Sequence, residues 1–349
     1  MTHDLASSRP RRALVCGIGG QDGAYLAALL LAKGYEVIGT SRDANAVNLD
    51  GLRALGIAER VTVLSMVPSD FRTVLRTITR SEPDEIYNLA GQTSVGMSFE
   101  QPVEAIESIS IGTLNLLEAM RFVGRPIRFY NAGSSECFGD TGTAVAGEAT
   151  PFRPRSPYAV AKVCAQNLVS NYREAYKLFA CTGILFNHES PLRPTHFVTQ
   201  KIVRSAARIA AGSGERLRLG NIDIHRDWGW APEYVEAMWL MLQQDEPDDF
   251  VIATGRTVSL AHFVQQTFAF FDLDWQQHVT TDPALLRPSD IRYGAADPAL
   301  ALQRLGWAAR TDVDDVIRNM CRAATVSVQL VAPVLAAAPT NAAASRKAA

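Results

Sequence analysis

A tyrosine and a lysine stand four residues apart in the segment SPYAVAK, as Tyr158 and Lys162. At that spacing both side chains lie on one face of a helix. A lysine ammonium beside a tyrosine lowers the free energy of forming the phenolate, so this tyrosine could take or return a proton at a hydroxyl-bearing carbon during hydride transfer. The pattern Y-x-x-x-K also occurs by chance in many helices, so it needs support from the rest of the chain.

Two hydroxyls and a carboxylate, Ser134, Ser135 and Glu136, follow the strand-like run PIRFY after only three residues, NAG. A chain that only turns from a buried strand into a loop does not need a carboxylate there. Cys137 comes next but has no paired base in the sequence, so we interpret it as a neighbour without a chemical role.

Three glycines, Gly17, Gly20 and Gly23, form G-x-x-G-x-x-G between a strand-like run and a helical one. Glycine lets the backbone turn tightly and approach a diphosphate, which the unpaired N–H groups of a helix N-terminus attract. Such turns also arise from packing alone, but this one lies in a complete strand–helix–strand unit, which favours a dinucleotide. With this motif upstream and Ser134 at a later strand end, chance is a poor explanation for the tyrosine–lysine pair.

The end of the second strand bears on the choice of cofactor. Arg42 favours NADP, because arginine suits a 2′-phosphate, whereas Asp43 keeps NAD open, because a carboxylate suits the ribose 2′-hydroxyl. An ordinary solvated charge is the alternative interpretation of Arg42.

Strands alternate with helices through the first half of the chain. This alternation predicts an α/β fold with a Rossmann-type doubly wound parallel sheet, whose ligands bind outside the carboxyl ends of the strands. Beyond about residue 187, longer loops separate short strands in ERLRLG and DDFVIATG. We expect a disordered leader (1–11), a mainly NAD(P)-binding Rossmann domain (12–186), a smaller substrate-binding lobe with interleaved Rossmann elements (187–325) and a disordered tail (326–349).

Composition argues against several classes of protein. The formal net charge of −2 gives no basic field for nucleic acid or an anionic membrane. The longest apolar stretches fall far short of the ~20 residues that span a bilayer. Five cysteines are scattered without metal-like spacing, so we expect no metal site and no disulfide framework, and a cytoplasmic location.

The glycine pattern, NLAGQTSV, GSSECFG and SPYAVAK together resemble the extended short-chain dehydrogenase/reductase family. Within it, FNHESPLR, FVTQKI, RDWGWAPEYVEAMWLMLQ and VIATGRTVSL are similar to the GDP-mannose 4,6-dehydratase family. The likeness runs from about Arg12 to Cys321. It implies an NADP-dependent lyase, with NAD possible, that converts GDP-mannose to GDP-4-dehydro-6-deoxy-D-mannose and water on the route to GDP-fucose or other deoxyhexoses.

The resemblance also implies a role for each reactive side chain. Tyr158 accepts the C4 hydroxyl proton while hydride leaves C4, Ser134 holds the C4 oxygen, and Lys162 also binds the nicotinamide ribose. The resulting ketone acidifies C5–H, and Glu136 removes that proton and protonates the C6 hydroxyl so that water leaves. Hydride then returns to C6 and a proton to C5.

The remaining contacts are likewise implied by the resemblance. Cofactor contacts are expected from Gly17, Gly20, Gln21, Asp22, Gly23, Arg42, Met66, Val67, Leu89, Ala90, Gln92, Tyr158, Lys162, His188 and Arg193. Substrate contacts are expected from Ser94, Ser135, Asn187, Lys201, Arg226 and Arg287, among which the arginines suit a diphosphate. The alternative for His188 is a hydrogen-bonded structural role, and the alternative for the arginines is ordinary surface charge. For Trp228, Trp230 and Trp239 we expect packing in the core and not stacking on a base.

The chain departs from the usual family pattern at Ser134, commonly threonine, and at Met66, commonly aspartate. The basic segment after the second strand is short. We expect a homodimer or homotetramer joined through helices at 103–121 and 159–176, because each carries an apolar stripe.

Three other functions stay open at this point. A 4-epimerase or 4-reductase would share the glycine motif and the tyrosine–lysine pair. A dehydratase of another sugar nucleotide would share the whole set. A cofactor-binding scaffold would retain the fold without needing paired bases.

Overall fold

The computed structural model describes residues 9–336 of the 349-residue chain, with side chains through Val326. Its main feature is a seven-stranded parallel sheet with the order β10-β6-β5-β4-β1-β2-β3. The strands are β1 (Arg12–Cys16), β2 (Glu36–Ser41), β3 (Thr62–Ser65), β4 (Glu85–Asn88), β5 (Arg128–Ala132), β6 (Ala180–Leu185) and β10 (Phe250–Ile252). The predicted doubly wound sheet is confirmed.

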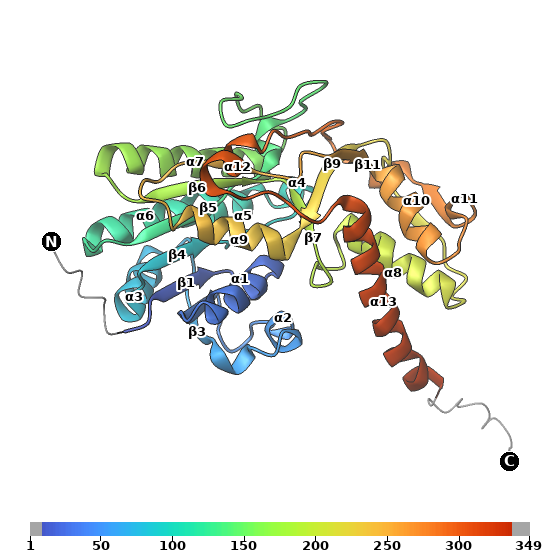
Figure 1. Ribbon diagram of the computed structural model, residues 1–349, viewed down its shortest axis with the longest axis horizontal. Helices are drawn as coiled ribbons and strands as arrows, with labels where there is room; N and C mark the ends of the chain where they lie inside the picture. The colour runs from blue at the N-terminus through green and yellow to red at the C-terminus, as the bar shows by residue number, and fades with distance from the viewer. Residues whose placement is uncertain (1–8, 337–349) are drawn as a thin grey trace, which may run out of the picture.

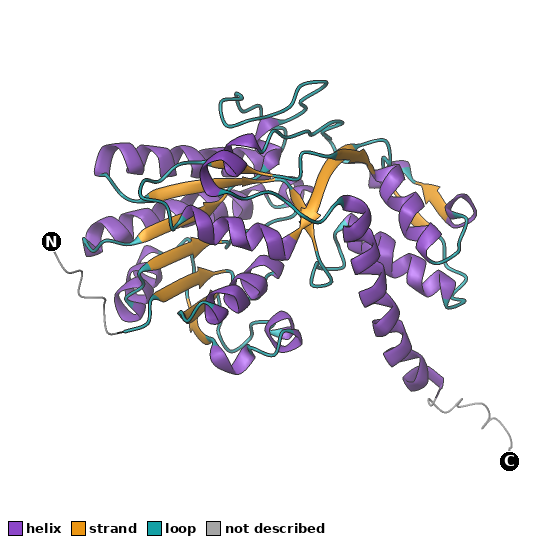
Figure 2. Cartoon of the chain, in the orientation of Figure 1, coloured by secondary structure: helices purple, strands orange, loops and turns teal. Residues whose placement is uncertain are grey.

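Alternation along β1 explains why helices cover both faces of this sheet. Ala13 and Val15 point into one core cluster, while Leu14 and Cys16 point into another. The first cluster lies under α1 (Gln21–Ala32) and α9 (Ala231–Met241), and the second under α3 (Phe71–Ser81), α6 (Gly112–Val123) and α7 (Pro157–Tyr176). Figure 2 shows these helices on both sides of the strands.

Shorter elements fill the connections of this larger part. They are α2 (Asp50–Ala54), η1 (Ala58–Arg60), α4 (Val95–Glu100), α5 (Pro102–Ile106), the π-turn η2 (Glu107–Ile111), η3 (Ser135–Phe138) and α12 (Ala299–Leu305). The helix predicted at 103–121 therefore runs as α5, η2 and α6 in succession.

A smaller lobe with its own core lies at the other end of the long axis (Figure 1). Trp228 is buried in it against Phe263, with ring centroids 5.5 Å apart, which confirms packing as its role. Its elements are β7 (Asn187–Glu189), α8 (Val198–Ala210), β8 (Leu217–Leu219), β9 (His225–Trp230), β11 (Thr257–Ser259), α10 (Leu260–Phe270), α11 (Trp275–His278), β12 (Val279–Thr281), η4 (Pro283–Leu285) and α13 (Val313–Ala336).

The two parts interleave along the chain. β10 pairs with β6, and α9 packs on α1, although both come from beyond residue 187. The division expected at that residue stays a prediction. No helix among the described residues is long and apolar enough to cross a membrane.

The chain ends differ in part from the expectation. Arg9, in the expected leader, donates hydrogen bonds of 2.8 and 2.9 Å to Asp84. Helix α13 continues to Ala336, so helix extends into the tail expected from residue 326. The disorder expected in that tail stays a prediction. Residues 1–8 and 337–349 lie outside the described range.

Candidate active site

The predicted glycine motif forms a tightly packed turn between β1 and α1. Gly17 has φ +88°, and a Cβ there would lie 2.9 Å from the carbonyl oxygen of Leu89. A Cβ on Gly23 would lie 2.4 Å from the carbonyl oxygen of Gly17. Gly20, the N-cap of α1, offers no side-chain hydrogen bond, so N–H groups of the first turn remain for an anion. A nicotinamide dinucleotide fits this turn.

Helix α7 presents the tyrosine and the lysine. Ser156 caps it by accepting a 3.1 Å hydrogen bond from the Ala159 amide, and Tyr158 and Lys162 are buried on its inner face. Lys162 Nζ donates to the carbonyl oxygen of Ala132 at 2.7 Å and lies 5.8 Å from the centre of the Tyr158 ring. Burial lowers the pKa of Lys162 to about 8. Burial also raises the pKa of Tyr158, and a hydrogen bond with Ser134 opposes that rise, so the phenol is protonated at neutral pH.

The end of β5 places Ser134 and Glu136. Gly133 precedes them because a Cβ there would lie 2.7 Å from Thr182 Cγ2 and 2.9 Å from the carbonyl oxygen of Gly183. Ser134 Oγ caps η3 by accepting a 3.3 Å hydrogen bond from the amide of Glu136. The short helical turn directs the carboxylate into the same cavity as Tyr158.

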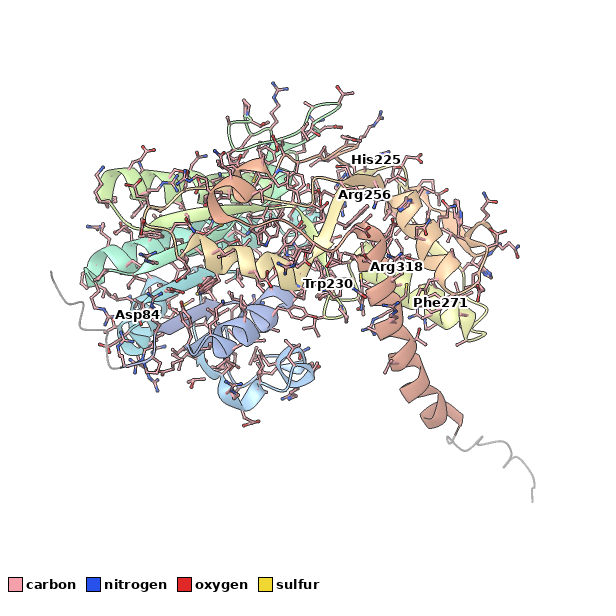
Figure 3. The ribbon with its side chains drawn as sticks, in the orientation of Figure 1. Asp84, His225, Trp230, Arg256, Phe271 and Arg318 are labelled. Atoms are coloured by element: carbon pink, nitrogen blue, oxygen red, sulfur yellow. The ribbon has the colours of Figure 1, made fainter. Side chains whose placement is uncertain are left out.

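Strand β9, whose ends His225 and Trp230 are labelled in Figure 3, carries a buried arginine toward that carboxylate. Arg226 Nη2 lies 3.9 Å from Glu136 Oε1 and 3.6 Å from Asp290 Oδ1. Burial raises the pKa of Glu136, while the positive charges of Arg226 and Arg287 act in the opposite direction. The carboxylate is therefore held in a low-polarity site, yet beside cations that suit a diphosphate.

One cavity of about 360 Å³ collects most of the predicted site residues at the carboxyl ends of the strands. Leu89, Gly133 and Phe186 line it directly after β4, β5 and β6. The predicted residues that line it are Asp22, Leu89, Ser94, Ser134, Ser135, Glu136, Tyr158, Lys162, Asn187, His188, Arg193, Lys201, Arg226 and Arg287.

The other predicted cofactor residues lie outside this cavity. Arg42 is exposed at the end of β2 and pairs with Glu104 at 3.1 Å. Met66 is only 1% exposed, in the core beside α3, so the structure does not bring it to the cavity. The remaining members of this set are Gly17, Gly20, Gln21, Gly23, Val67, Ala90 and Gln92.

Several lining residues escaped prediction. Asp290 Oδ1 is buried without a hydrogen-bond partner among the described residues, and it stands between Arg226 and Arg287. Asp290 lies three residues after the predicted Arg287, in the segment RPSD, which could have indicated it. Phe197, whose ring lies 3.7 Å from the Arg193 guanidinium, opens the motif FVTQKI, which likewise could have indicated it. Asn221, in the loop after β8, had no signal in the sequence. The described residues contain no cluster of three His, Cys, Asp or Glu side chains able to hold a metal ion.

The chain is similar to proteins of one family along nearly its whole length. A family model described as GDP-mannose 4,6 dehydratase matches residues 14–320. GDP-mannose 4,6 dehydratase 1 of Arabidopsis thaliana is 44% identical over 323 residues, which cover 89% of each chain. The Homo sapiens GDP-mannose 4,6 dehydratase is 41% identical over 346 residues, which cover 92% of this chain and 93% of that one.

Solved structures share the fold at lower identity. UDP-glucose 4-epimerase from Thermotoga maritima superposes with a TM-score of 0.81 at 20% identity, covering 91% of this chain and 99% of its own. UDP-glucose 4-epimerase from Thermus thermophilus, in complex with NAD, gives 0.78 at 26% identity, covering 90% and 98%. RMD from Pseudomonas aeruginosa, complexed with NADPH, gives 0.75 at 21% identity, covering 91% and 99%.

Proposed function

Because the chain belongs to the GDP-mannose 4,6-dehydratase family, we infer that its central cavity carries out that family's reaction. The protein is a carbon–oxygen lyase that converts GDP-α-D-mannose to GDP-4-dehydro-6-deoxy-α-D-mannose and water. The observation that carries this function is the partly buried carboxylate of Glu136, which lines the same cavity as Ser134, Tyr158 and Lys162. A 4-epimerase or 4-reductase on this fold would need the hydroxyl and the tyrosine–lysine pair but no second base.

Different side chains act at C4 and at C5 and C6. Ser134 holds the C4 oxygen while Tyr158 accepts its proton and C4 is oxidised. The ketone acidifies C5–H, and Glu136 removes that proton. As the carboxylic acid, Glu136 then protonates the C6 hydroxyl, which leaves as water. A nicotinamide cofactor, when bound, would supply the hydride acceptor for C4 and the donor for C6. A proton then returns to C5, which completes the 4-dehydro-6-deoxy sugar.

The diphosphate of the substrate is assigned to the arginine pair beside Glu136. Arg226 donates one 2.9 Å hydrogen bond to the carbonyl oxygen of His225, which leaves other N–H groups facing the cavity. Arg287 lies 3.7 Å from Asp290, whose single negative charge offsets only one of the two positive charges. The proposed sugar and nucleoside contacts are Ser94, Ser135, Asn187 and Lys201, although Lys201 Nζ also donates to the carbonyl oxygen of Arg218 at 2.6 Å.

The mass of the product tests the reaction. Incubation with GDP-mannose should give a product lighter than the substrate by one water. An unchanged mass would instead support epimerisation, and a gain of two hydrogens would support net reduction. Cofactor binding without turnover of any sugar nucleotide would support a scaffold. The same measurement on a panel of sugar nucleotides tests how strictly guanine and mannose are required.

NADP is the proposed cofactor, because Ser41 ends β2 and Arg42 follows it, where a 2′-phosphate would lie. Arg42 is exposed and pairs only with Glu104 in the described structure, so it is free to exchange that partner for a phosphate. Arg42→Ala should weaken NADP⁺ binding by roughly tenfold and NAD⁺ binding far less, since one charge-assisted contact is lost. Calorimetric titration measures both, and Arg53→Ala, at another exposed arginine, is the control. Equal losses for the two cofactors would refute the 2′-phosphate role.

A homodimer is the proposed minimal assembly, with a homotetramer as the larger alternative. The successive helices α5, η2 and α6, and helix α7, expose Val103, Ile111, Phe122, Val160 and Tyr176, more apolar surface than a free helix face usually shows. Two-fold pairing of these helices would cover it. Light scattering at micromolar concentration should give at least twice the 38.0 kDa chain mass. A monomer mass would contradict the assembly.

The cytoplasm is the proposed location. All five cysteines are free, and four of them are buried, as suits a reducing compartment. A fluorescent fusion located by microscopy would test it.

A further inference from the structure

A carboxylate occupies an unexpected place in the cofactor-binding turn. Asp22 lies in the first turn of α1, and its side chain lines the cavity. The positive end of the helix dipole suits an anionic ligand there, but a free carboxylate would repel the diphosphate of a dinucleotide. Some other group must therefore balance this charge.

That group is His188, which comes from strand β7. His188 Nε2 lies 2.9 Å from Asp22 Oδ2, and His188 Nδ1 lies 2.7 Å from the carbonyl oxygen of Phe186. An ionised carboxylate and a carbonyl are both pure acceptors, so each ring nitrogen must carry a proton to satisfy them. The geometry therefore requires the imidazolium form. The ring is buried and stacks on Tyr234 with 4.5 Å between centroids, which fixes its orientation.

The charged groups around the ring favour the same state. Burial alone would lower the pKa of His188, and Arg193 acts in the same direction, but the charge and hydrogen bond of Asp22 raise the pKa overall. Glu189, on the same strand, lies between His188 and Arg193, pairing with Arg193 at 3.3 Å. Tyr234, from α9, adds no charge at neutral pH because burial raises its pKa.

Hydrogen bonds from Gln21 reinforce the link between α1 and β7. Gln21 Nε2 donates to the carbonyl oxygen of His188 at 3.1 Å, and Gln21 Oε1 accepts from Ser190 Oγ at 2.7 Å. Two consecutive residues of α1 are thus bonded to the segment 188–190, which lies 166 or more positions away in the chain. The cofactor turn cannot shift without breaking several buried hydrogen bonds.

We propose that Asp22, partly exposed to the cavity, and the buried His188 form an ionic clamp that neutralises the carboxylate at the cofactor end of α1 and fixes the glycine turn against β7. Both are positioning residues, which prepare the helix end for the cofactor diphosphate before the cofactor arrives. The role of the clamp in cofactor binding rests on the proposed assignment of a nicotinamide dinucleotide to this turn. The charge state of His188 is independent of that assignment.

Nitrogen-15 spectra of the free protein, labelled at its six histidines, test the charge state. At pH 7.5 the His188 ring should show two protonated nitrogens, and its signals are identified by their loss in His188→Leu. Asp22→Asn should change the ring to the neutral form, with Nδ1–H donating to Phe186 and Nε2 accepting from the new amide. A wild-type ring with one protonated nitrogen would overturn the proposal.

Calorimetric titration with NADP⁺ and NAD⁺ tests the role of the clamp. His188→Leu leaves the carboxylate unbalanced and should weaken binding by on the order of tenfold. Asp22→Asn keeps the hydrogen bonds and the net charge of the pair, so it should bind within about threefold of wild type. The double variant should recover most of the loss seen in His188→Leu. If it binds as weakly as His188→Leu, the carboxylate is not repulsive and the clamp is refuted. Failure of the wild type to bind either cofactor would contradict the cofactor assignment instead.

Discussion

Glu136→Gln should oxidise GDP-mannose at C4 and then stop before water is lost. The amide keeps the shape of the side chain but can neither remove the C5 proton nor protonate the C6 hydroxyl. Loss of a positioned general base typically lowers the rate by about 10²–10⁴-fold. Tyr158 and Ser134 remain, so the first step still proceeds. The variant should accumulate reduced nicotinamide, visible by its absorbance, together with a 4-keto sugar that retains its C6 hydroxyl.

Two comparisons make this result decisive. Glu59→Gln removes the same charge at an exposed position in η1 and should leave the rate unchanged. Because burial raises the pKa of Glu136, wild-type kcat should fall with decreasing pH at a higher pH than an exposed glutamate would cause. The residual kcat of Glu136→Gln should not show this fall with decreasing pH. Dehydration at nearly the original rate would show that Glu136 is only a polar turn residue.

Tyr158→Phe should block the reaction one step earlier. Without the phenol oxygen, no group takes the C4 hydroxyl proton, so C4 oxidation should slow by about 10²–10⁴-fold. No reduced nicotinamide should accumulate, in contrast to Glu136→Gln. Rapid-mixing absorbance on the two variants separates them. Tyr176→Phe, on the same helix but exposed, is the matched control. A burst of reduced nicotinamide in Tyr158→Phe would assign the C4 proton to another group.

The sequence allowed the reactive set to be predicted because its members depend on local structure. Ser134 and Glu136 follow a strand, and Tyr158 and Lys162 share the first turns of a helix, so the order of strands and helices suffices to bring them to one sheet edge. Arg226, in the smaller lobe, was predicted as a site residue from the family resemblance. The wider fold followed from the alternation of strands and helices, which is a short-range pattern.

Other features depend on contacts that no local pattern records. The placement of Asp290 between two arginines needs the path of the loop after η4, and the contact of Asp22 with His188 needs the register of strands far apart in the chain. His188 was predicted only as a cofactor contact or a hydrogen-bonded structural residue. Its ionisation state requires both hydrogen-bond partners to be known.

The edge position of β10 limits how this enzyme can be re-engineered. A chain cut near residue 187 would remove β10 and expose the hydrogen-bonding edge of β6, and such bare edges promote aggregation. It would also strip α9 from α1 and uncover apolar surface. Exchanging the small lobe between relatives to alter substrate choice therefore requires a discontinuous graft, in which β10 and α9 stay with the parent scaffold. A single crossover near residue 187 would produce a chimera whose sheet lacks the parent's own β10 at one edge and the parent's own α9 on one face.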